Sequence, residues 1–175
     1  MANNWQRWLL TLVLATSNAR AAAQAPEHSD TKYREAVRRA VELLPKRPAQ
    51  ILVIDVNDAK PEDRDYLLRL QAFIIPGRQV VFLTKHGDVL RLAQQGSRFH
   101  EYMLATVIWH EMAHLEGADE AEARRREEAL WTRFLADGAV DRDAGLNYLV
   151  ALKHRPPADR PSAGEIVVRA GTAER

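Results

Sequence analysis

The segment from Ser97 to Gly117 constrains the fold more than any other part of the chain. It begins at a favoured helix cap and ends at a glycine that can terminate a helix in the left-handed conformation. Apolar residues recur at helical spacing in between, and they are Phe99, Met103, Leu104, Val107, Ile108, Met112 and Leu115. We therefore predict one long helix that buries an apolar face, with a small sheet packed on it.

The composition sets limits on partners and on site chemistry. A chain of 175 residues with 46% hydrophobic and 28% charged residues is typical of one soluble globular domain. The net charge of +1 argues against nucleic-acid binding, and the arginines at 124–126 would point in different directions on a helix. There is no cysteine, so any transition metal must be held by His, Asp or Glu.

The two ends of the chain differ in composition from the part between them. Residues 1–23 contain Arg7, a short apolar run and a final alanine cluster, which is the layout of a signal peptide. We therefore expect a secreted or periplasmic protein with no membrane span in the mature chain; the alternative is an amphipathic first helix of the domain. Residues 28–155 are expected to form the domain, and residues 156–175 a flexible tail rich in Pro, Ala, Gly and charge.

Periodicity and turn residues predict the order of elements, which indicates an α+β domain. We expect two helices after the long one, because glycines and prolines divide the sequence there. The predicted elements are a helix between Thr31 and Pro45, a strand at 51–56, a helix from Pro61 that includes Phe73, a strand at 78–84, a third strand or extended piece at 89–92, the long helix, and helices at 119–136 and 141–153.

Two histidines in the long helix are spaced for metal binding. His110 and His114 are four residues apart, so a helix places them one turn apart on the same face. Glu111 lies beside that face, where it can reach a water on the metal without being a ligand. A hydrolytic zinc site needs this combination of nitrogen ligands and a carboxylate base. The alternative is that both histidines are simply polar positions on a charged helix.

A third protein ligand is expected just after Gly117. Glu120 is the preferred candidate, because it falls in the first turn of a helix that must pack back on the long one after a short connection. Glu122 and Glu127 remain alternatives.

The sequence "HEMAH" at 110–114 resembles the His-Glu-x-x-His signature of the zincin metallopeptidases. Metzincins carry a third histidine where this chain has Glu120, whereas gluzincins use a glutamate on the following helix, as "EAEA" at 120–123 resembles. The connection is shorter here than is usual in gluzincins. The resemblance spans about residues 65–137 and implies a zincin-like fold. It also implies that an edge strand at Val80 to Leu83 pairs with extended substrate; the alternative is an ordinary core strand.

These observations predict a zinc metallopeptidase that hydrolyses peptide or protein substrates. Zn²⁺ would be held by His110, His114 and Glu120, with Glu111 as general base for the attacking water. Candidates for steadying the oxyanion, each of which also fits a surface or packing role, are Tyr148, Tyr102, His100 and His154. The alternatives are a non-catalytic secreted zinc-binding or interaction module on the same fold, and a helical domain without a metal. Oligomeric state is not indicated.

Overall fold

The computed structural model describes residues 31–155 as an α+β domain, mostly helical, with one three-stranded mixed sheet. The signal peptide predicted at 1–23 and the tail predicted at 156–175 lie outside the described residues. The elements are a helix at residues 31–42, β1 (Ile51–Ile54), the 3-10 helix η1 (Val56–Asp58), α2 (Pro61–Leu67), β2 (Ala72–Ile74), β3 (Val81–Thr84), α3 (Asp88–Gln94), α4 (Arg98–Leu115), α5 (Glu120–Ala136) and α6 (Arg142–His154).

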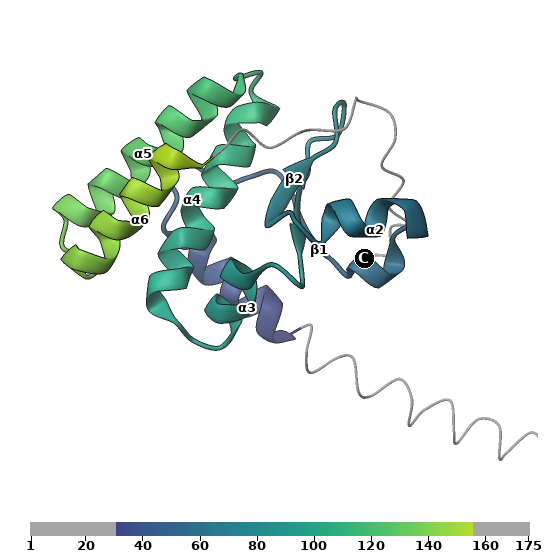
Figure 1. Cartoon of the computed structure of the whole chain (residues 1–175), viewed down its shortest axis with the longest axis horizontal. Helices are drawn as coiled ribbons and strands as arrows, with labels where there is room; N and C mark the ends of the chain where they lie inside the picture. Colours follow the sequence, from purple (N-terminus) through teal and green to yellow (C-terminus); the bar gives the residue numbers. More distant parts are fainter. Residues whose placement is uncertain (1–30, 156–175) are drawn as a thin grey trace, which may run out of the picture.

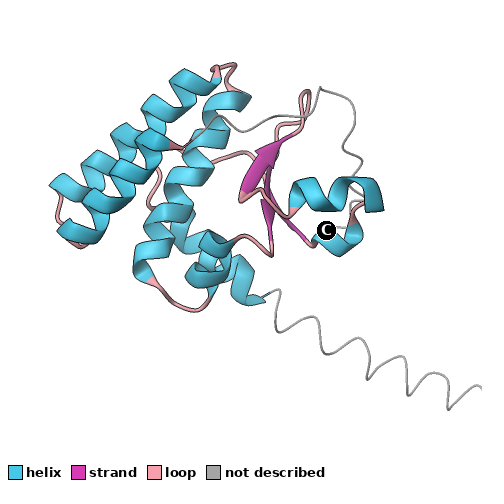
Figure 2. Ribbon diagram, viewed as in Figure 1, coloured by secondary structure: helices cyan, strands magenta, loops and turns pink. Residues whose placement is uncertain are grey.

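Helix α4 is the central element of the domain. It contacts α3, α5 and two strands of the sheet, and α5 in turn packs on α6 (Figure 1). The α5–α6 pair therefore lies on one side of α4 and the sheet on the other, with α2 beyond the sheet (Figure 2). Within residues 31–155, no helix combines the length and apolar composition needed to cross a membrane.

Both faces of the sheet are covered, which explains its apolar strands. Side chains alternate between faces along a strand, so Val81 and Leu83 join the main core with α4 while Phe82 points the opposite way. Phe82 stacks on its cross-strand partner Phe73 at a ring-centroid distance of 5.0 Å. Phe73 and Phe82 belong to a second, smaller hydrophobic core, which lies under η1 and α2 and includes Leu67.

The helices on the C-terminal side of α4 agree with the sequence predictions. The α4–α5 connection contains Gly117 at φ +90°, a left-handed conformation that favours glycine. Asp119 then caps α5 by accepting a hydrogen bond from the backbone N–H of Glu122. Helix α6 begins in the same way, with Asp141 accepting from the backbone N–H of Ala144. The three long helices and their ends are thus confirmed.

The prediction of a helix from Pro61 through Phe73 was wrong beyond Leu67. Phe73 lies in β2, which pairs antiparallel with β3. The pairing begins at Gln71, whose carbonyl accepts the backbone N–H of Thr84, and the hydroxyl of Thr84 donates to the carbonyl of Leu70. Tertiary pairing with β3 therefore overrides the local helical pattern.

The third strand predicted at 89–92 is the helix α3 instead. Val89, Leu90 and Ala93 are buried on one side of that helix, and Gln71 Oε1 accepts the N–H of Val89 in its first turn. The first strand is also shorter than predicted, because Asp55 caps η1 and directs Val56 out of the sheet.

The position of the predicted edge strand was wrong as well. The strand order is β1-β3-β2, so Val81–Thr84 is the central strand, parallel to β1 and antiparallel to β2. This agrees with the alternative of a core strand, and it leaves β2 as the edge strand that contacts α4.

We expect Trp131→Phe to destabilise the domain by about 1–3 kcal/mol, because it leaves a cavity and removes a buried hydrogen bond. Trp131 is 0% exposed, and its indole N–H donates to the carbonyl of Gly145 on α6 at 2.8 Å. Urea unfolding followed by far-UV circular dichroism measures the change. A loss below about 0.5 kcal/mol, within the range of an ordinary surface substitution, would contradict the assigned role in α5–α6 packing.

Candidate metal centre

The candidate metal centre lies where the last turns of α4 meet the first turn of α5. His110 and His114 occupy the buried side of α4 that faces α5, and both side chains are buried. The connection through Gly117 brings α5 back along α4, so that Glu120, its first residue, lies opposite the histidines. The structure thus brings together all three residues that the sequence indicated as ligands.

The three potential ligand atoms form a small triangle. His110 Nε2 and His114 Nε2 are 3.0 Å apart, and Glu120 Oε2 lies 3.4 Å from His114 Nε2 and 3.7 Å from His110 Nε2. A triangle with these sides has a centre about 2.0 Å from each corner, which is within the roughly 2.0–2.2 Å bond lengths of zinc to nitrogen and oxygen ligands. The spacing therefore fits one small metal ion.

The outer nitrogen of each histidine faces an acceptor. His114 Nδ1 is 2.9 Å from the carbonyl oxygen of Ala118, and His110 Nδ1 is 3.0 Å from Glu127 Oε2. The His110 contact is an ion-pair distance without the direct alignment of a hydrogen bond. A carbonyl and a carboxylate oxygen are both acceptors, so these contacts suit histidines that carry a proton on Nδ1 and offer Nε2 to a metal ion.

Three potential ligand atoms therefore converge at distances that could accommodate one cation. The pKa of His110 also reflects the charges around these atoms. Burial acts to lower it, but the carboxylates of Glu127, Glu111 and Glu120 outweigh burial, and the pKa lies above its usual value. The surrounding carboxylates thus favour the charged form of His110.

Glu111 is buried on α4, next to His110 in the sequence, and its charge contributes to the raised pKa of that histidine. It is not part of the group of three residues whose atoms could share one metal ion. Its position therefore suits a base beside the centre better than a ligand.

The two alternative ligands lie elsewhere. Glu122 is half-buried on α5, where it pairs with Arg125 and Arg126. Glu127 is buried, but it approaches the outer nitrogen of His110 and not the triangle. Geometry therefore favours Glu120 among the three acids.

No direct signal in the sequence marks the residues that support the candidate ligands. Arg124 donates through Nε to Glu120 Oε1 at 2.9 Å, which leaves Oε2 for the histidines. From the sequence, Glu127 was predicted only as a possible ligand, and no prediction was made for Arg155. In the structure, Arg155 Nη1 lies 3.5 Å from Glu127 Oε1. Arg124 follows Glu120 by one turn of helix and Glu127 follows it by two turns, so all three lie on one face of α5. This helical spacing was the only indication in the sequence that they act together.

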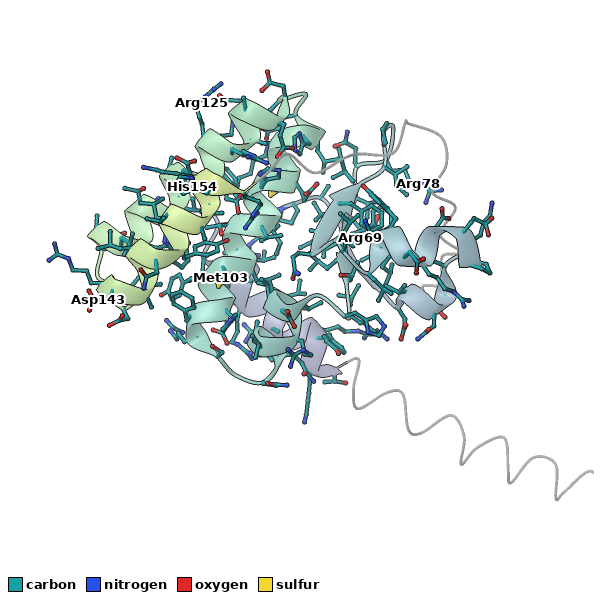
Figure 3. The ribbon with its side chains drawn as sticks, in the orientation of Figure 1. Arg69, Arg78, Met103, Arg125, Asp143 and His154 are labelled. Carbon is teal, nitrogen blue, oxygen red and sulfur yellow. The ribbon has the colours of Figure 1, made fainter. Side chains whose placement is uncertain are left out.

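The four oxyanion candidates have other surroundings. Tyr148 lies 3.5 Å from Glu127 behind His110, and Tyr102 packs on Phe134. His100 interacts with Ser97 at the start of α4, at 2.7 Å, and its pKa is lowered, mainly by burial. His154 is exposed on the last turn of α6 (Figure 3). The contacts of all four fit packing or surface roles.

Comparisons with known proteins give no relative for this chain: no family model, no curated protein and no solved structure matches it significantly. The interpretation of the site therefore depends on its own residues and geometry.

We expect Tyr148→Phe to remove part of the alkaline instability of the metal-free protein. Burial and the nearby charge of Glu127 raise the pKa of Tyr148 from 10.0 to about 12. A raised folded-state pKa gives stability that is complete below about pH 10 and lost as the pH rises through 12, about 3 kcal/mol for two units. Urea unfolding between about pH 9 and 12 should show the stability of the unmodified protein falling relative to that of the variant; a difference independent of pH would contradict this.

Proposed function

We propose that this protein is a zinc-dependent metallopeptidase of the zincin type, gluzincin-like in its third ligand, that hydrolyses peptide bonds. The observation that carries the proposal is the convergence of His110 Nε2, His114 Nε2 and Glu120 Oε2 beside the buried Glu111. Two histidines and one carboxylate form a ligand set that zinc hydrolases use, and such a set leaves a coordination position for water or substrate.

The donor atoms favour zinc over the harder cations. Calcium takes six to eight oxygen ligands, and magnesium prefers oxygen ligands in octahedral geometry, whereas two of the three atoms here are imidazole nitrogens. Both histidines also have acceptors at their outer nitrogens, as is usual for histidines that bind metals.

In the proposed reaction, the metal ion, the general base and the ligands have separate roles. Zinc, when bound, supplies a Lewis acid for the scissile carbonyl and for an attacking water. Glu111 accepts the proton of that water and transfers it to the leaving nitrogen, so one water is added across the C–N bond and an acid and an amine are released. His110, His114 and Glu120 would hold the ion, while Arg124 binds the second oxygen of Glu120.

The edge strand β2 supports an extended peptide as substrate. Thr84 donates its N–H to the carbonyl of Gln71, so along β2 the main-chain groups of Phe73 also face β3 while those of Ala72 and Ile74 face away from it. Within residues 31–155 no strand pairs with that outer side of β2, and β2 as a whole contacts α4. An extended peptide can add to such an edge through main-chain hydrogen bonds.

We expect the purified protein to bind one zinc ion, and Glu120→Gln to weaken binding more than the roughly 10- to 100-fold typical of removing an outer partner. The matched control is Glu122→Gln, which neutralises a glutamate in the same turn of α5 that pairs with surface arginines. Elemental analysis gives the stoichiometry, and competition with a chromophoric chelator gives the affinity. Equal affinity in the two variants would exclude Glu120 as a ligand.

We expect Glu111→Gln to bind zinc as the unmodified protein does but to lose hydrolysis by roughly 10²- to 10⁴-fold, the usual contribution of a general base. Cleavage of dye-labelled unfolded casein measures the rate, with Glu116→Gln, an exposed glutamate close after the motif, as control. Retained activity in Glu111→Gln would contradict its role. If the unmodified protein binds zinc and shows no turnover, the non-catalytic zinc-binding module is the better description.

A further inference from the structure

Side chains behind the candidate metal centre meet at the C-terminal end of α6. Arg155 Nη1 lies 3.5 Å from Glu127 Oε1, and the carbonyl oxygen of Arg155 accepts a hydrogen bond from Arg124 Nη1. Glu127 faces the outer nitrogen of His110, and Arg124 binds the outer oxygen of Glu120. One residue at the end of α6 therefore contacts both groups that support two of the candidate ligands.

The carboxylate of Glu127 is buried, and its contacts offset the energetic cost of that burial. Its side chain is 2% exposed, and an ionised carboxylate is costly to bury unless it is paired. An apolar residue of similar size would commonly pack at lower cost. Glu127 contacts His110, Tyr148 and Arg155, and the phenol of Tyr148 donates to its Oε1 at 3.5 Å. The carboxylate is thus held from behind while its other oxygen faces His110.

Glu120 requires support for a different reason. It lies in the first turn of α5 with a partly exposed side chain, and a flexible glutamate there loses rotamer freedom when it binds a metal ion. The contact between its Oε1 and Arg124 restricts it before any ion arrives and directs Oε2 toward the histidines. Preorganisation of this kind raises affinity by lowering the entropy lost on binding.

We propose that Glu127, Arg124 and Arg155 form a positioning cluster that fixes His110 and Glu120 for metal binding, so that the end of α6 sets the metal affinity. This inference rests on the proposed zinc site. None of the three residues is a ligand or a catalytic residue; each acts through a ligand that it holds.

The main test compares Glu127→Leu and Glu127→Gln with Glu101→Gln. Glu101 is a second buried glutamate paired with an arginine, Arg39, but it lies near the other end of α4. Zinc affinity is measured by chelator competition, site geometry by the absorption spectrum of the Co²⁺ form, and folding by urea unfolding without metal. We expect a roughly 10- to 100-fold loss of affinity in Glu127→Leu with an altered Co²⁺ spectrum, partial recovery in Glu127→Gln, and neither effect in Glu101→Gln.

A surface variant keeps the test valid if replacement of Glu127 prevents folding. The Arg155 side chain is 47% exposed, so Arg155→Met should fold, and we expect its zinc affinity to fall roughly two- to fivefold, in line with the modest energy of an exposed ion pair. Arg125→Met is the control, because Arg125 projects outward from α5 and pairs with Glu122 (Figure 3).

The outcomes separate this inference from the proposed function. If the unmodified protein binds neither Zn²⁺ nor Co²⁺, the zinc site and the cluster are both wrong. If it binds zinc, and the Glu127 and Arg155 variants bind equally tightly with the same Co²⁺ spectrum, the cluster is wrong and the zinc site stands. An equal loss of affinity in Glu101→Gln or Arg125→Met would assign the effect to general destabilisation and would also overturn the cluster.

Discussion

Three potential ligand atoms face one another at the junction of α4 and α5, at distances of 3.0, 3.4 and 3.7 Å, and this spacing suits one small cation. Acceptors face both outer histidine nitrogens, and Arg124 binds the outer oxygen of Glu120. These contacts orient the two imidazole rings and the carboxylate toward one point. A cation at that point would be stabilised by all three groups.

The short connection between α4 and α5 determines where the third donor can lie. Gly117 adopts φ +90°, which lets the chain reverse within a few residues, and Asp119 begins the next helix at once. The carbonyl of Ala118 in the same turn faces the outer nitrogen of His114. One tight turn thus orients a histidine and brings Glu120 opposite the pair. A longer connection would leave the first turn of α5 free to shift along α4, and the triangle would lose its definition.

The sequence predicted what depends on local rules and missed what depends on tertiary pairing. Helical periodicity, caps and Gly117 determine the ends of α4 and α5, so the positions of His110, His114 and Glu120 could be predicted from spacing alone. The sheet could not, because "LLRLQAF" at 67–73 fits a helix until β3 is available to pair with Phe73. The role of Glu127 was also beyond sequence reasoning: burial beside His110 follows from the packing of α5 on α4, with α6 behind it.

The charges around the proposed metal centre would favour the binding of a cation. Three carboxylates, those of Glu111, Glu120 and Glu127, act on His110, while two guanidinium groups, from Arg124 and Arg155, pair with Glu120 and Glu127. With neutral histidines these five groups leave one negative charge without compensation in a largely buried region, where an excess charge is costly. A proton on His110 removes the excess, which agrees with its raised pKa, and a divalent ion would replace that proton. A bound metal ion would thus compete with the proton on His110 for the same negatively charged surroundings.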